Sequence, residues 1–147
     1  MSTKQLQERF GASGLKGGKA EEWLFDKLNH VYDDVIDLRE DWKSQIDGID
    51  FGIKKDSWHN TYYLDSKGNL NDMIFYLELS KNSEPGWFWK SKSDRIYHVD
   101  VKNNRAAWYS LPEMRYAISR LGLPLDKELV KIKANDIIFK NIIKWTY

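Results

Sequence analysis

Short apolar segments separated by turn residues follow one another between residues 46 and 109, and this pattern limits the possible folds more than any other feature. Strand-favouring residues are enriched in these segments, and apolar and polar positions partly alternate, as in half-buried strands. Asn, Gly, Pro and other polar residues interrupt the pattern between segments. The expected strands cover 46–53, 61–67, 73–79, 96–101 and 106–109, and the last two form a hairpin whose turn is 102–105.

Helices are expected on both sides of these strands. Over residues 19–30, apolar residues recur at helical spacing, and Glu21 and Glu22 lie in the first turn, where the helix dipole favours acids. A second helix is expected over 111–121, because residues 110–113 form a capping-box sequence with an early proline and a glycine follows the helix. This order of elements predicts an α+β, or mixed α/β, core.

The 147 residues suit one compact domain, and no internal repeat suggests another arrangement. Residues 1–18 contain four glycines and little apolar pattern, so we expect a flexible N-terminal arm. Residues 123–147 form a C-terminal extension whose pattern fits a strand or a helix, and the choice stays open. No apolar run reaches the roughly 18 residues that span a bilayer, and the N-terminus lacks a signal-peptide core. We expect a cytoplasmic protein without membrane contact.

Composition restricts the chemistry of any site. Cysteine is absent, which excludes disulfides, thiolate nucleophiles and cysteine-bound metals, and the three histidines are too widely spaced for a zinc motif. A metal would therefore bind carboxylates, which suit Mg²⁺ or Mn²⁺. Residues 1–85 hold 11 Lys and Arg against 16 Asp and Glu, whereas residues 86–147 hold 12 against 6. An acidic part for cations and a basic part for phosphates suits an enzyme acting on phosphodiesters, although solvated surface charge explains the asymmetry equally well.

Asp50, Asp65 and Lys67 form the constellation with the clearest chemistry. Side chains alternate along a strand, so Asp65 and Lys67 share a face and Ser66 points away. If the strands carrying Asp50 and Asp65 pair as a hairpin, the two carboxylates approach each other and can share a divalent cation. Such a cation lowers the pKa of a bound water, and Lys67 would orient that water or stabilise charge on the phosphate. The alternative interpretation is structural, since the same residue types favour turns at strand ends.

Gly48-Ile49-Asp50, followed on the next strand by Asp65-Ser66-Lys67, resembles the motif of the PD-(D/E)XK, or restriction-endonuclease-like, nuclease superfamily. The resemblance covers residues 19–121 and includes Gln45 ahead of the first motif, while isoleucine replaces the proline of the superfamily name. It implies a restriction-endonuclease-like core with a central mixed β-sheet flanked by helices. It also implies a Mg²⁺- or Mn²⁺-dependent endonuclease that hydrolyses DNA phosphodiester bonds, with Asp50 and Asp65 as metal ligands and Lys67 as a catalytic residue. Many members act as homodimers, and a phage-encoded member would work in the host cytoplasm.

In that superfamily an acid on the helix before the sheet often completes the metal site, and Glu21 or Glu22 would take this role and assist catalysis. The sequence does not choose between them. A competing register places the acid-x-Lys motif at residues 78–80, with serine in the lysine position and Lys81 one residue late, which would make the site inactive. We prefer Asp65 because it keeps the alternation with Lys67.

Five basic residues in the second half of the chain are candidates for contacts with nucleic-acid phosphates. They are Lys90, Lys92, Arg95, Lys102 and Arg105. Solvated surface charge is the competing explanation for them, and core packing is the preferred role for most aromatic residues nearby. Two other functions stay open. A non-catalytic nucleic-acid-binding or regulatory protein on the same scaffold would bind without cleaving, and a module that docks a protein partner through residues 87–89 would not bind nucleic acid even at low salt.

Overall fold

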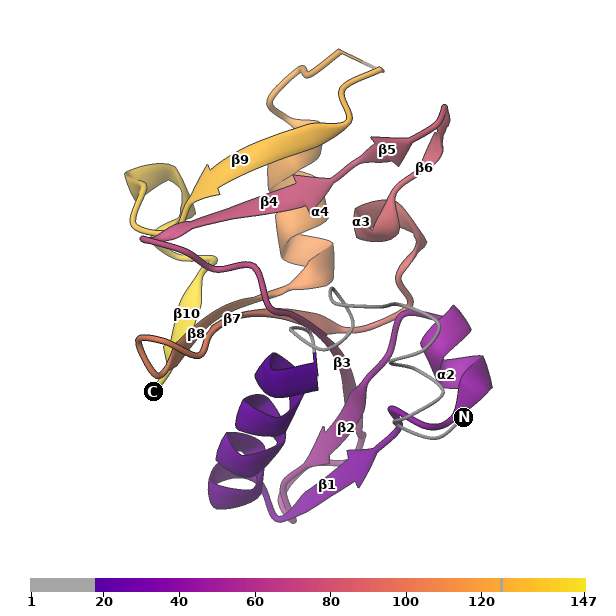
Figure 1. Ribbon diagram of the computed structural model, residues 1–147, viewed down its shortest axis with the longest axis vertical. Coiled ribbons are helices and arrows are strands. Elements are labelled where there is room, and N and C mark those ends of the chain that lie inside the picture. The colour runs from indigo at the N-terminus through magenta and orange to yellow at the C-terminus, as the bar shows by residue number, and fades with distance from the viewer. Residues whose placement is uncertain (1–17, 125) are drawn as a thin grey trace.

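A six-stranded sheet forms the centre of the computed structural model, which describes residues 18–124 and 126–147 (Figure 1). In spatial order its strands are β1 (Asp34–Asp37), β2 (Phe51–Lys54), β3 (Tyr62–Lys67), β7 (Arg95–Asp100), β8 (Arg105–Ser110) and β10 (Lys144–Thr146). Neighbouring strands are antiparallel except β3 and β7, which run parallel. The expected α+β class with a central mixed sheet is confirmed. The N-terminal arm expected over 1–18 lies outside the described residues, apart from residue 18, which is helical.

β2 and β3 pair as an antiparallel hairpin, which is the condition under which the sequence brings Asp50 and Asp65 together, and Phe51 lies opposite Leu64. After β3 the chain leaves the sheet and returns as β7, and residues 68–94 form the long connection that a parallel neighbour requires. In this register Lys67 lies opposite His98 of β7. The last residues of β3, 65–67, therefore extend beyond the start of β2 at Phe51 and pair with β7.

The helix over residues 18–31 covers one face of the sheet (Figure 1). Its buried residues Ala20, Leu24 and Leu28 recur every four positions, so they share one side of the helix. They pack against apolar side chains of the central strands, namely Phe51, Ile53, Leu64, Tyr97, Val99 and Ala106. The helix expected over 19–30 is confirmed, and this packing holds its first turn close to the sheet, with Glu21 half-buried and Glu22 exposed.

A second layer covers the opposite face. It consists of β4 (Ile74–Glu78), β5 (Ser80–Lys81), β6 (Glu84–Pro85), α3 (Trp87–Lys90), α4 (Leu111–Ser119), β9 (Leu129–Lys133) and the 3-10 helix η1 (Ile137–Phe139). β4 and β9 pair only with each other, and their buried residues pack with those of α4 and of the sheet. The small hairpin of β5 and β6 extends from the end of β4 toward α3 (Figure 1). As a result, the end of β4 and the start of α3 lie together.

Two expectations about local structure are wrong, and one is confirmed with an unexpected partner. Residues 46–53 do not form one strand, because the short helix α2 (Trp42–Ile46) precedes a turn and β2 begins only at Phe51. The strand expected over 73–79 is confirmed as β4, and it pairs with β9 outside the central sheet. Ser110 is the N-cap of α4, yet its side chain makes no capping hydrogen bond. The expected hairpin of β7 and β8 is present, with its turn one residue earlier, at 101–104.

The C-terminal residues are built into the domain. β9 pairs with β4, and β10 extends the central sheet beside β8, with Trp145 opposite Ala107. Exposure alternates along β9, where Val130 and Ile132 are buried between exposed residues. The choice left open for this segment is therefore settled as strand over 129–133 and 144–146, with η1 between them. No helix in the described part of the chain is long and apolar enough to cross a membrane.

Candidate active site

Asp50 lies immediately before β2, at the end of a firmly anchored turn. Gly48 has a φ of 71°, and a Cβ at this position would lie 3.0 Å from Ser91 Oγ, so both the backbone conformation and the available space favour glycine. The Ser91 hydroxyl donates to the Gly48 carbonyl at 3.0 Å. The Gln45 side-chain amide donates to the Ile49 carbonyl at 2.9 Å and to Asp50 Oδ1 at 3.2 Å. The turn after α2 thus orients the Asp50 carboxylate.

The backbone amide of Ser66 joins Asp50 to Asp65. Its N–H donates to Asp50 Oδ2 at 2.9 Å and to Asp65 Oδ1 at 3.0 Å. Pairing of β2 with β3 brings the two acids together, as the sequence predicts, and each is only 5% exposed. Because both accept from this one N–H, the two carboxyl groups lie close together. Two buried acids this close repel each other when both are ionised, unless a proton or a cation lies between them.

Asp50 is the most strongly perturbed acid of the site. Burial raises its pKa well above the usual range, and the charges of Asp65 and Glu21 raise it further, whereas the hydrogen bond from Ser66 opposes the shift. Without a bound cation, Asp50 therefore keeps its proton more readily than an exposed aspartate. Placing like charges together in a buried position does not stabilise a fold, and such clusters are typical of functional sites.

Lys67 completes the constellation. It lies on the same face of β3 as Asp65, as strand alternation predicts, and its Nζ is 3.1 Å from Asp65 Oδ2. Nζ also lies 4.8 Å from the centre of the Trp87 ring. Burial lowers the pKa of Lys67, but the charges of Asp65, Asp50 and Glu78 outweigh it, so the net shift is upward. The ammonium therefore stays charged and can donate to an anionic oxygen in the site.

The two candidate acids of the helix differ in their surroundings. The Glu22 side chain is 70% exposed and pairs with Arg39, whose Nη1 is 2.6 Å from Oε1, while the same guanidinium binds Asp37 at 2.6 Å. Glu21 is more enclosed: burial raises its pKa to about 7, Arg39 lowers it, and the charge of Asp65 raises it. Glu21 is thus placed within electrostatic range of the aspartate pair, whereas Glu22 is engaged by Arg39.

The five basic residues expected to contact phosphates do not gather in one place. Lys90 and Lys92 are exposed at the end of α3, and Lys92 pairs at 3.3 Å with an aspartate of the turn that leads to Asp50. Arg95 begins β7, and its guanidinium packs on aromatic rings, 4.4 Å from the nearest ring centre. Lys102 and Arg105 lie around the turn at the other end of β7. Only the first two residues therefore lie beside the site.

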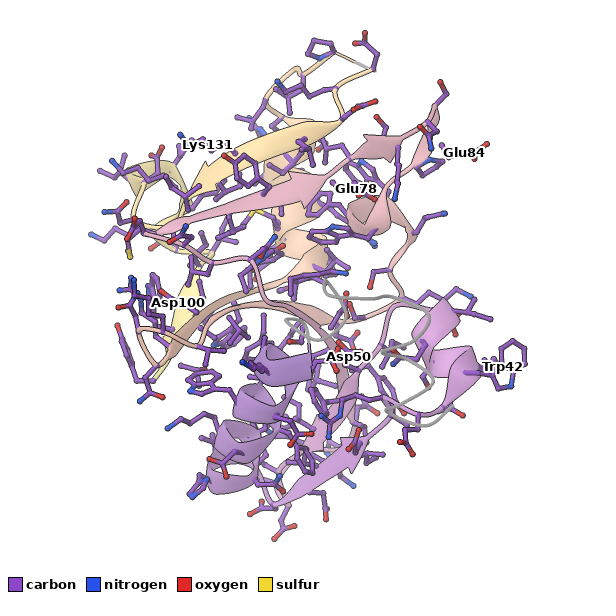
Figure 2. All side chains as sticks on the ribbon, viewed as in Figure 1. Trp42, Asp50, Glu78, Glu84, Asp100 and Lys131 are labelled. Atoms are coloured by element: carbon purple, nitrogen blue, oxygen red, sulfur yellow. The ribbon has the colours of Figure 1, made fainter. Side chains whose placement is uncertain are left out.

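Glu78 and Trp87 adjoin Lys67, although the sequence suggests Glu78 only for a competing register and Trp87 only for docking a partner. Glu78 ends β4 beside α3 (Figure 2), and its Oε1 accepts a hydrogen bond from the Trp87 backbone N–H at 3.3 Å. Glu78 belongs to the separate ribbon and not to the central sheet, so the register at 78–80 is not the one that faces Asp50. No sequence signal links Lys67 to Trp87, because the two residues belong to elements that meet only in the folded chain.

His98 packs behind the lysine as a fully buried, neutral side chain. Its ring stacks on Phe75 with centroids 3.8 Å apart. Burial, together with the charge of Lys67, lowers its pKa well below the usual range, so Nδ1 donates to Asn69 Oδ1 at 2.6 Å and Nε2 accepts from the Tyr109 hydroxyl at 2.8 Å. His98 thereby forms a rigid support for the site, as expected for a packed histidine. His59, by contrast, is exposed in the connection between β2 and β3.

The donors of the site fit an oxygen-preferring divalent cation. Asp50 and Asp65 present buried carboxylates whose mutual repulsion, visible in the raised pKa of Asp50, a cation would relieve. Over residues 18–124 and 126–147, no group of three or more acidic, histidine or cysteine side chains is arranged to hold an ion. The described chain therefore assembles a pair of carboxylates, with Glu21 nearby but outside the pair.

No protein-family model matches the chain, and comparisons with curated proteins and with solved structures give no significant match. Function is therefore inferred from the side chains that the fold brings together. These are two buried aspartates on one backbone amide, a charged lysine beside them and an enclosed glutamate on the neighbouring helix.

Proposed function

We propose that this protein is a divalent-metal-dependent endonuclease that hydrolyses DNA phosphodiester bonds on a restriction-endonuclease-like core. One observation carries the proposal: the buried carboxylates of Asp50 and Asp65 share one amide donor, and the ammonium of Lys67 lies 3.1 Å from Asp65. A buried acid pair attracts a cation, and an adjacent fixed positive charge suits a phosphate.

The order of the elements supports the same function. The helix that carries Glu21 comes first, Asp50 precedes β2, and Asp65 and Lys67 follow on β3. This is the order in which the resemblance to the nuclease superfamily places its helix acid, its first aspartate and its acid-x-Lys motif.

Each side chain has a chemical role in this proposal. When bound, a divalent cation would neutralise the scissile phosphate and lower the pKa of the attacking water. Asp50 and Asp65 would hold the cation, with Glu21 assisting from the helix. Lys67 donates either to the attacking water or to the phosphate oxygen on which negative charge develops. The amide of Ser66 keeps the two carboxylates aligned while their charge state changes.

DNA is the proposed substrate. The excess of basic residues over 86–147, 12 against 6 acidic ones, supplies attraction for phosphates, and Lys90 and Lys92 lie nearest to the turn that carries Asp50. In the proposed enzyme a homodimer would place one site on each strand of a duplex.

Cleavage of supercoiled plasmid, branched DNA and single-stranded DNA in Mg²⁺ or Mn²⁺ tests this function. We expect metal-dependent nicking by the wild-type protein and no nicking by Asp65→Ala or Lys67→Ala. Asp26→Ala is the matched control, because Asp26 is an exposed acid on the helix over 18–31, away from the aspartate pair. Circular dichroism of all variants establishes that they fold.

The failure of this experiment is informative in two ways. Binding of these DNAs without cleavage in either metal, by folded protein, would support the non-catalytic nucleic-acid-binding protein on the same scaffold. Absence of both cleavage and binding at low salt would contradict both nucleic-acid functions, because phosphate attraction is strongest under those conditions.

A further inference from the structure

We infer that Trp87 is a positioning residue that holds the Lys67 ammonium in place through its indole ring. This inference rests on the proposed function, since it concerns the lysine of that site. The Lys67 ammonium has two close partners of different chemistry: the carboxylate of Asp65 at 3.1 Å and the ring of Trp87, whose centre is 4.8 Å away. An ammonium at this distance from an indole is attracted by the electron density of the ring.

The two partners are not equivalent during a reaction. Asp65 is also a proposed cation ligand, so its attraction for Lys67 weakens when its charge is shared with a cation. Trp87 is uncharged and is not a proposed ligand of the divalent cation. Its attraction for the Lys67 ammonium would therefore stay the same when that cation binds. A lysine side chain has four rotatable bonds, and a second partner is therefore needed to keep its ammonium at one position.

Trp87 is itself held from several sides. Its backbone N–H donates to Glu78 Oε1 at 3.3 Å, and its ring lies 6.0 Å from the buried ring of His98. Gly86, just before it, packs so closely on Glu78 that a Cβ there would lie 2.3 Å from the Glu78 carbonyl oxygen. The start of α3 is thereby pressed onto the end of β4. The indole is presented to Lys67 by a rigid junction.

Steady-state cleavage kinetics separate this role from a merely structural one. We expect Trp87→Leu to lower kcat about tenfold with KM nearly unchanged, since a cation–π contact of ordinary strength is removed while substrate contacts remain. Trp87→Phe, which keeps an aromatic face, should recover most of kcat. Trp89→Leu is the matched control: it makes the same change two positions along the same helix, on a tryptophan that is 41% exposed. We expect it to leave kcat unchanged.

A spectroscopic measurement tests the contact without reference to activity. In protein with ¹³C-labelled lysines, the ε-methylene signal of Lys67, identified by its loss in Lys67→Gln, should be shifted upfield by the ring current of Trp87. The shift should persist in Trp87→Phe in reduced form and disappear in Trp87→Leu. If the wild-type protein cleaves no DNA, the proposed function fails, whereas this signal still decides the inference. An unshifted Lys67 signal in the wild type, or equal loss of kcat in Trp87→Leu and Trp89→Leu, would overturn it.

Discussion

Asp50 and Asp65 accept hydrogen bonds from the same backbone amide, at 2.9 and 3.0 Å. The donor belongs to Ser66, which lies between Asp65 and Lys67. One backbone N–H of β3 therefore fixes the positions of both carboxylates. A charged acceptor strengthens such a bond, and an ionised carboxylate gains more from it than a protonated one. The shared amide therefore favours the ionised form of both carboxylates, which the proposed cation would require, whereas burial favours the protonated form.

Divalent cations should stabilise the fold through the aspartate pair. We expect Mn²⁺ at about one hundred times its dissociation constant to raise the free energy of unfolding by about 2.7 kcal/mol, which is several degrees in melting temperature. In Asp50→Asn this rise should be largely lost, and the cation-free variant should be at least as stable as the wild type, because a repulsive charge is gone. Thermal unfolding with EDTA or Mn²⁺ measures both effects. An undiminished rise in Asp50→Asn would show that the cation binds elsewhere, and Asp26→Asn provides the surface control.

The contribution of Glu21 to the stability of the cation-free protein should fall as the pH rises from about 4.5 to about 7. Burial raises the pKa of Glu21 to about 7 in the fold, against 4.5 for an ordinary glutamate. A group with a raised folded pKa contributes stability that is complete below its unfolded pKa and is lost as the pH passes through the folded value. Urea unfolding in EDTA at several pH values, for wild type and Glu21→Gln, measures the effect. The free energy of unfolding of the wild type, relative to that of the variant, should fall across this window. The lowered pKa of His98 and the raised pKa of Asp50 also make stability depend on pH, but both groups are present in the two proteins, so the difference between the two profiles reports Glu21.

Gly86→Ala should damage both the fold and the site. The added methyl group would overlap the Glu78 carbonyl at 2.3 Å, so the junction of β4 and α3 must move apart. Overpacking of this kind costs typically about 1–3 kcal/mol, and here it also displaces the Trp87 ring from Lys67. Urea unfolding and cleavage kinetics together test this expectation. Gly18→Ala serves as the control, since a Cβ added there would meet no atom of the described chain within 4 Å beyond its immediate neighbours. Wild-type behaviour of Gly86→Ala would contradict the tight junction.

Arg115 on α4 should contribute more to the free energy of unfolding than an ordinary surface arginine. Its guanidinium donates to the Phe88 carbonyl at 2.9 Å and to the Ser91 carbonyl at 2.7 Å, and so closes the end of α3. Loss of these charged hydrogen bonds in Arg115→Gln should lower the free energy of unfolding by about 2 kcal/mol. Arg120→Gln, which removes an exposed arginine from the end of the same helix, should change it by less than about 0.5 kcal/mol. Equal effects in urea unfolding would mean that general surface charge, and not the closure of α3, is responsible.

Ser66→Ala should be tolerated. The buried hydroxyl has no hydrogen-bond partner within the described chain, whereas the backbone amide makes the contacts to Asp50 and Asp65. Removing an unpartnered buried hydroxyl should leave the free energy of unfolding within about 1 kcal/mol of the wild type or increase it, and cleavage should persist. A large loss of cleavage in Ser66→Ala would assign the hydroxyl a role of its own.

Local patterns were sufficient for much of the fold. The helix over 18–31, the hairpin of β2 and β3 and the hairpin of β7 and β8 all follow from side-chain periodicity and turn residues in short windows. The partner of β4 could not be predicted in this way, because β9 comes about fifty residues later and nothing local distinguishes a ribbon strand from a sheet strand. The alternation at Leu129–Lys133 was itself visible in the sequence and would have supported a strand.

Some residues of the site could be predicted from local sequence, and others could be distinguished only in the folded structure. Asp65 and Lys67 share a strand, so alternation alone places them on one face, and the hairpin brings Asp50 to them. Glu21 and Glu22 are adjacent in the first helical turn, so the sequence cannot choose between them. The folded structure distinguishes them, because Arg39 pairs with Glu22. The short helix α2 was missed because a five-residue helix is a single turn, held by the Asp41 cap and not by propensity.

The two aspartates are aligned by the backbone N–H of residue 66, and the side chain at this position makes no hydrogen bond with them. We therefore expect position 66 to accept other small or β-branched residues, whereas proline, which lacks an N–H, would remove the shared donor. Relatives that use the same arrangement should keep the spacing of the two aspartates along the paired strands, even where most other positions differ.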